Sequence, residues 1–125
     1  MPTEIIVESE DRPGVIAEIG ELLGEANVNI RAAAAIAHGG HGYLHFVVDN
    51  ADRALSALKL GGWMVKATRE VLAVTIGDEP GELGRYARRL AAAGVSITAL
   101  YTAGERGGDK ELIVAVDDIA AARRA

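Results

Sequence analysis

The sequence predicts an α+β protein made of two ferredoxin-like units, each with the order β-α-β-β-α-β and an antiparallel sheet. Two observations support this prediction. The motif Asp11-Arg12-Pro13-Gly14 recurs 67 residues later as Asp78-Glu79-Pro80-Gly81, and each copy stands between a strand-like run and an amphipathic helix. The similarity continues along both copies, so we divide the chain into residues 1–68 and 69–125.

Each element of the first copy has a local cause. Residues 4–9 are rich in β-branched side chains and predict a strand. Pro13 suits the first position of a helix, and apolar side chains spaced along one face, opposite glutamates, predict a helix over 13–26. The remaining predicted elements are a strand from about 30 to 37, a hairpin loop at 38–42, a strand at 43–48, a helix at 51–60 and a strand at 63–67.

The second copy repeats this order but is shorter. Its predicted elements are a strand at 70–76, a helix at 80–93, a strand at 95–103, a loop at 104–109, a strand at 110–116 and a helix from about 118. Its β-like Thr98–Thr102 also indicates that the equivalent alanine-rich run Ala32–Ala37 is a strand, although alanine favours helix. The sequence ends before a fourth strand, so we expect residues 71–76 to have an open edge that another segment or a partner chain covers.

The composition excludes several classes of function. The 125 residues carry a formal net charge of -5 and contain no cysteine, which removes disulfides, thiolate nucleophiles and cysteine-based metal sites. An acidic balance with only 4% aromatic residues argues against nucleic-acid binding. The longest apolar run is too short to cross a membrane and the first residues do not form a signal peptide, so we predict a cytoplasmic protein that binds no membrane.

Other candidate chemistry is weak in this sequence. His38, His41 and His45 fall within eight residues, but two lie in the glycine-rich loop and no acid or thiol completes a shell, so we predict no metal site. The three serines lack the turn that presents a catalytic nucleophile. The glycine clusters of both hairpins open no helix in the manner of a phosphate-binding loop and predict turns. We therefore predict neither catalytic residues nor a cofactor.

Two longer stretches carry a family resemblance. They run from Asp11-Arg12-Pro13-Gly14-Val15-Ile16 to Asn27-Val28-Asn29-Ile30, and from Asp78-Glu79-Pro80-Gly81-Glu82-Leu83 to Gly94-Val95-Ser96-Ile97. Both resemble the ACT domain, and the resemblance covers essentially the whole chain. It implies a non-catalytic regulatory protein that senses a small amino acid and acts through a partner enzyme or regulator, as in stand-alone tandem ACT proteins of the glycine cleavage repressor type. The family's side-by-side pairing, the open edge and a third strand that is apolar on both faces lead us to expect a homodimer.

The chemistry of an α-amino acid indicates where a ligand would bind. Unpaired N–H groups at the start of helix 13–26 offer an anion site, Gly14 lets a carboxylate approach the backbone, and Asp11 can hold the ammonium group. Asn29, which we place beside this loop, can reach the same ligand or, equally, pin the strand. The candidate ligand-binding residues of the first copy are Asp11, Arg12, Gly14, Val15, Ile16, Asn29 and Ile30.

The second copy offers a weaker version of this site, with Asp78, Gly81 and Ser96 as candidates. There Glu82 stands at the helix start, where an acid repels a bound carboxylate, so we favour the first copy. Asp-x-Pro-Gly before a helix is also ordinary turn chemistry. The alternative is therefore a structural or protein-interaction module in which the pocket is vestigial and pairing of sheet edges is the function.

Overall fold

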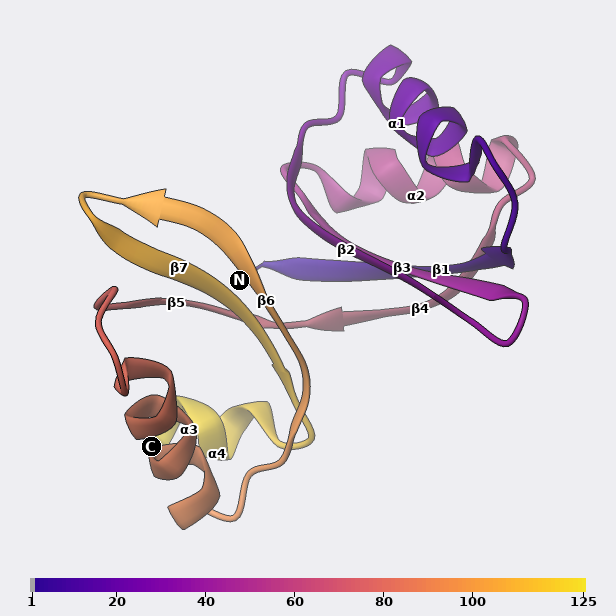
Figure 1. The fold of residues 1–125 in the computed structure, drawn as a ribbon. Coiled ribbons are helices and arrows are strands. Elements are labelled where there is room, and N and C mark those ends of the chain that lie inside the picture. The colour runs from indigo at the N-terminus through magenta and orange to yellow at the C-terminus, as the bar shows by residue number, and fades with distance from the viewer. Residues whose placement is uncertain (1) are drawn as a thin grey trace. The chain divides into compact units, whose positions relative to one another are not determined.

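The computed structural model describes residues 2–125 and divides them into two compact units. The first unit is Thr3–Arg69, and the second is Glu70–Ala125 together with Pro2. Each unit has its own antiparallel sheet, with two helices on one face of that sheet (Figure 1). The predicted α+β architecture, including the shortened second unit, is confirmed.

The first unit contains all six expected elements: β1 (Thr3–Glu10), α1 (Val15–Glu25), β2 (Ile30–His38), β3 (His41–Val48), α2 (Ala51–Leu60) and β4 (Met64–Glu70). Its strands lie in the order β2-β3-β1-β4, and β3 pairs antiparallel with both β1 and β2. Alternate residues of β1 and β3, among them Ile5 and Phe46, point toward the helices and pack with Ile19, Leu23 and Leu58. This packing forms the core of the unit.

The second unit contains β5 (Leu72–Ile76), α3 (Glu82–Ala92), β6 (Ile97–Arg106), β7 (Asp109–Val116) and α4 (Ile119–Arg124). Its three strands lie in the order β5-β7-β6, so β5 forms an edge of this sheet. In the first unit the equivalent strand β1 is flanked on that side by β4. The core of the second unit is smaller and includes Tyr86, Leu90, Leu112 and Val114.

Both long helices begin later than predicted. The expected helices 13–26 and 80–93 are observed as Val15–Glu25 and Glu82–Ala92, so Pro13 and Pro80 lie in the preceding turns. The reason is that Gly14 and Gly81 have φ angles of 92° and 88°. This left-handed conformation is open to glycine and cannot continue a right-handed helix.

Both hairpins are tighter than predicted. The expected loops 38–42 and 104–109 shrink to Gly39-Gly40 and Gly107-Gly108, because the strands continue to the residues on either side. All four glycines have positive φ angles, which is typical of the two-residue turns that match the twist of a hairpin. The run Ala32–Ala37 lies within β2, as its counterpart in the second copy indicated.

Candidate functional site

The four helices within residues 2–125 begin in two different ways. At the start of α2 the side chain of Asn50 accepts a hydrogen bond from the Arg53 N–H at 3.0 Å, and at α4 Asp118 accepts from the Ala121 N–H at 3.0 Å. Helices α1 and α3 follow left-handed glycines, and no side chain caps them. The first turns of α1 and α3 therefore keep N–H groups for an acceptor that their own side chains do not supply.

A cavity of about 290 Å³ lies at the start of α1. Its walls are residues 9–12, 14–17, 35–37 and 42–44. These segments meet because β1 and β2 are each antiparallel to β3 and therefore run in the same direction, so both end where α1 begins. The Asp11 N–H donates to the Gly40 carbonyl oxygen at 3.1 Å, which ties the loop after β1 to the turn between β2 and β3.

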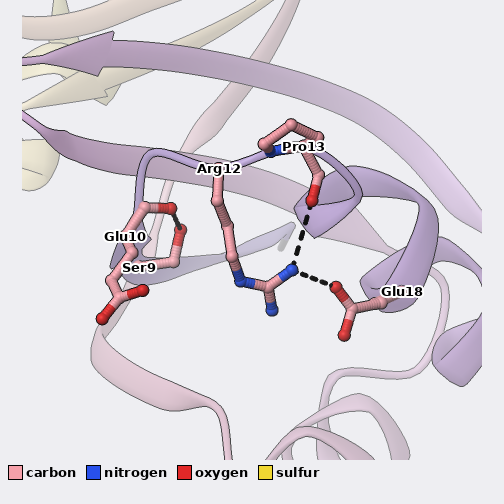
Figure 2. A network of polar contacts seen from close by, with 5 residues as sticks. All are labelled: Ser9, Glu10, Arg12, Pro13 and Glu18. Carbon is pink, nitrogen blue, oxygen red and sulfur yellow. Dashed lines mark hydrogen bonds and ion pairs between the residues drawn. The ribbon is translucent and has the colours of Figure 1, made fainter.

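A polar network holds the turn at this cavity (Figure 2). The Arg12 Nη1 group donates to Glu18 Oε2 at 2.5 Å and to the Pro13 carbonyl oxygen at 3.3 Å, while the Ser9 hydroxyl donates to the Glu10 carbonyl oxygen. The hydrogen bond to Glu18 raises the pKa of Arg12, and the same bond lowers the pKa of Glu18. The lowered pKa favours the ionised form of Glu18. Its negative charge, in the first turn of α1, is balanced by the positive charge of Arg12.

The residues that line the cavity include one acid with a free carboxylate and several apolar side chains. Asp11 is exposed, and within residues 2–125 its carboxylate has no hydrogen bond or ion pair. Ile16 and Ile36 also line the cavity, yet they are 56% and 66% exposed, which is unusual for isoleucine. An acceptor for a cation, donors for an anion and an apolar wall are thus present together.

Only part of the predicted site is brought together. Asp11, Arg12, Gly14, Val15 and Ile16 all line the cavity. The structure adds Ser9, Ile36 and Tyr43, which sequence reasoning missed. The two-residue turn of the hairpin could have identified these three residues. A turn at Gly39-Gly40 fixes the register of the neighbouring strands. In that register Ser9 lies opposite Gly42, and Ile36 lies opposite Tyr43.

The placement of Asn29 and Ile30 beside this loop is wrong. They stand at the start of β2, and that start lies at the opposite end of the sheet from the end of β1 because the two strands run in the same direction. Asn29 instead pairs with Asp49: its N–H donates to Asp49 Oδ1 at 3.0 Å, and its carbonyl accepts from the Asp49 N–H at 3.1 Å. Neither Asn29 nor Ile30 lines the cavity.

The second unit brings together fewer of its candidates. Gly81 lines a cavity of about 850 Å³ between β5 and α3, whereas Asp78 and Ser96 do not. Asp78 forms an ion pair with Lys110 at 2.9 Å, and the Ser96 N–H donates to Asp117 Oδ1 at 2.9 Å, repeating the arrangement at Asn29. Glu82 stands at the start of α3, as expected, and the structure adds an ion pair between Glu82 and Arg85 at 2.5 Å.

The fold brings two of the three histidines together and leaves the third apart. His38 and His41 face one another across the hairpin, and His45 lies with its Nδ1 atom 3.2 Å from Glu4 Oε2. Among residues 2–125 no group of three or more histidine, aspartate or glutamate side chains is arranged to hold a metal ion. None of the helices in that part of the chain has the length and apolar character needed to cross a membrane.

Comparison with known proteins gives one family and several related folds. Residues 3–59 match the family model of the ACT domain. No match is found among curated proteins. A solved structure from Bacteroides thetaiotaomicron is similar to this chain with a TM-score of 0.88 and 22% identity, covering 98% of this chain and 83% of its own. The regulatory subunit of aspartate kinase from Thermus thermophilus has a TM-score of 0.74 and 20% identity, covering 98% of this chain and 89% of its own.

Proposed function

We propose that this chain, whose residues 3–59 belong to the ACT domain family, is a cytoplasmic, non-catalytic regulatory protein that binds a small amino acid and acts through a partner protein. The second unit then serves as a shortened ACT-like domain. One observation above all supports this proposal: the uncapped start of α1 opens into a cavity beside the free carboxylate of Asp11. An amino acid carries the two charges that these groups complement.

The geometry suggests how the ligand lies. Its carboxylate accepts hydrogen bonds from the first N–H groups of α1, which no side chain caps. The ion pair of Arg12 and Glu18 lies beside Gly14, where a Cβ atom would be 3.5 Å from Glu18 Oε2. The ligand's ammonium group pairs with Asp11, and its side chain packs against Ile16 and Ile36. Hydrogen bonds to charged groups contribute about 1.5–3 kcal/mol each, which is enough for a small ligand to bind in the micromolar to millimolar range.

The side chains that line the cavity support a role in binding and not in catalysis. Ser9 and Tyr43 supply the only hydroxyl groups among the residues that line it, and no histidine lines it. The Ser9 hydroxyl donates to a backbone carbonyl, so no side-chain base activates it. A regulatory role agrees with the fold that this chain shares with regulatory subunits of aspartate kinase.

We assign Asn29 and Ser96 to the support of the strands that follow them, since each N–H is held by an aspartate side chain. Because Asp78 is paired with Lys110 and neither Asp78 nor Ser96 lines the cavity of the second unit, we confine the amino-acid site to the first unit. We also propose that the chain works as a homodimer, with the exposed edge strands β2 or β5 as the pairing surface. Sedimentation velocity at micromolar concentration tests this: a single species of 13.0 kDa contradicts it.

A thermal-shift screen against the twenty amino acids tests the proposed function. A specific ligand at about 100 times its dissociation constant stabilises the protein by about 2.7 kcal/mol, which raises the melting temperature by several degrees. Asp11→Ala should remove that response. Glu21→Ala is the matched control, because it removes one exposed acid from the middle of α1, away from the cavity.

Two outcomes contradict the proposal. If no amino acid raises the melting temperature at millimolar concentration, the interaction module with a vestigial pocket becomes the better account. If Asp11→Ala and Glu21→Ala reduce the response equally, the ligand binds elsewhere.

A further inference from the structure

The cavity of about 850 Å³ in the second unit has a basic wall. Three arginines, Arg85, Arg88 and Arg89, line it from one face of α3, because positions three and four apart on a helix are neighbours. The rest of its wall comes from the end of β5 and the first turn of α3. This concentration of positive charge contrasts with the formal net charge of -5 on the whole chain.

Comparison with the first unit shows which residue has changed at this cavity. Arg89 stands where the first unit has Leu22, 67 residues earlier. Leu22 packs against the core beside Trp63, and a Cβ atom on Gly61 would come within 2.8 Å of Leu22 Cδ2. The chain therefore fills this space in the first unit as it turns from α2 into β4. In the second unit Arg89 stands at the position of Leu22 and lines the cavity, so a guanidinium group is found where the first unit has an apolar side chain.

The charges in this wall are only partly balanced. Glu82 is the one acid that lines the cavity, and it is paired with Arg85. The guanidinium of Arg89 lies 5.4 Å from the ring centre of Tyr86, and Arg88 has no ion pair or hydrogen bond within residues 2–125. Three arginines and one glutamate leave a net charge of +2 on the wall.

We propose that this cavity binds a small organic anion with two or more negative charges, such as a phosphate ester or a polycarboxylate. Guanidinium groups match the oxygen pairs of phosphate and carboxylate. The uncapped start of α3 adds N–H donors at the same place, and Val74, Ile76 and Tyr86 offer apolar surface to the organic part. This site is separate from the amino-acid site and does not depend on it.

Isothermal titration calorimetry on the full chain at low ionic strength, with pyrophosphate and citrate as probes, tests the proposal. The two probes distinguish phosphate from carboxylate recognition. Arg88→Gln with Arg89→Gln should weaken binding of the preferred probe at least about tenfold, because two charge-assisted contacts are lost. Arg124→Gln, an exposed arginine on α4 outside the cavity, is the matched control and should leave binding unchanged.

Several results would overturn this inference. They are the absence of saturable binding by either probe at millimolar concentration, an equal loss in Arg124→Gln, or binding of a single-stranded oligonucleotide that neither probe displaces. Circular dichroism of the double variant verifies that it is folded. Asp11→Ala should bind the preferred probe as the unchanged chain does, so failure here and failure of the amino-acid site are distinguishable.

Discussion

Helices α1 and α3 start from the same backbone geometry and carry opposite charge. Each follows a glycine with φ near 90°, and each lacks a side-chain cap. Yet Glu18 and Glu21 of α1 are replaced at the equivalent positions by Arg85 and Arg88. The first site also has the free acid Asp11 beside it, whereas its counterpart Asp78 is paired with Lys110.

The difference shows how one repeated fold can offer two kinds of site. The backbone N–H groups at the helix start attract an anion in both units. In the first unit the surrounding acids favour a ligand that also carries a positive charge, while in the second unit the arginines favour a ligand that carries only negative charge. On the two proposals above, the side chains distinguish between anions that the backbone alone would bind alike. The following predictions test this comparison, from the largest expected effect to the smallest.

The two cores provide the largest contrast. Leu23 and Leu90 occupy equivalent positions and are each 1% exposed, so replacing either with alanine should lower the free energy of unfolding by about 2–5 kcal/mol. Leu90→Ala should have the more severe consequence, since the described buried cluster holds six residues in the second unit and eleven in the first. Urea denaturation measures both variants. Leu60→Ala, at a residue 90% exposed, is the control, and an equal loss there would contradict the assignment of the cores.

The left-handed glycines are the next test. Gly14→Ala and Gly81→Ala should each lower stability by about 1–2 kcal/mol, because a Cβ atom is strained at their φ angles of 92° and 88°. Gly20→Ala, inside α1 with open space around it, should instead stabilise the protein by about 0.5–1 kcal/mol. Thermal denaturation of the three variants gives the sign of each change. A neutral result at both left-handed positions would mean that the two helices begin differently from the structure.

Removal of the side-chain caps should have a smaller effect. Asn50→Ala and Asp118→Ala each delete one hydrogen bond at a helix start and should lower the free energy of unfolding by about 1 kcal/mol. Chemical denaturation measures this loss. Asp52→Ala, in the first turn of α2 but not its cap, provides the comparison and should cost less.

The smallest effect is expected at the turn before α1. The hydrogen bond from Arg12 lowers the pKa of Glu18 in the folded protein, so the pair stabilises the fold above the ordinary pKa of 4.5. That contribution should disappear as the pH falls through the lowered value, because protonated Glu18 no longer attracts Arg12. Both side chains are about half exposed, so solvent weakens the effect. Stability profiles of the unchanged chain and of Glu18→Gln between pH 3 and pH 7 should converge at the acidic end; parallel profiles would exclude this role.

The sequence supports the order of elements better than their ends. The repeat and the apolar spacing predict the strands and helices, including the alanine-rich β2, because these signals are local. The sequence places both helix starts too early because proline is common in turns as well as at the first position of a helix. Only the positive φ angles of Gly14 and Gly81 show that Pro13 and Pro80 lie in turns.

The site was only partly predictable for a different reason. Asp11 and Gly14 are neighbours in the sequence, so their proximity follows from the turn itself. Ile36 and Tyr43 reach the cavity through the register of β2 and β3, and Asn29 is carried away from it by the direction of β2. The arginine-lined cavity forms where α3 lies beside the end of β5, which no local pattern around Arg88 reveals.

The backbone hydrogen bond from Asp11 to Gly40 connects a residue that lines the first cavity to the exposed turn of the β2–β3 hairpin. A ligand that immobilises Asp11 therefore also restrains the turn at Gly39-Gly40 through this hydrogen bond. This effect requires no movement of a helix. A partner protein bound to this turn would contact a less mobile surface when the first cavity is occupied than when it is empty. Nuclear magnetic resonance of the Gly40 amide would therefore report occupancy from a distance.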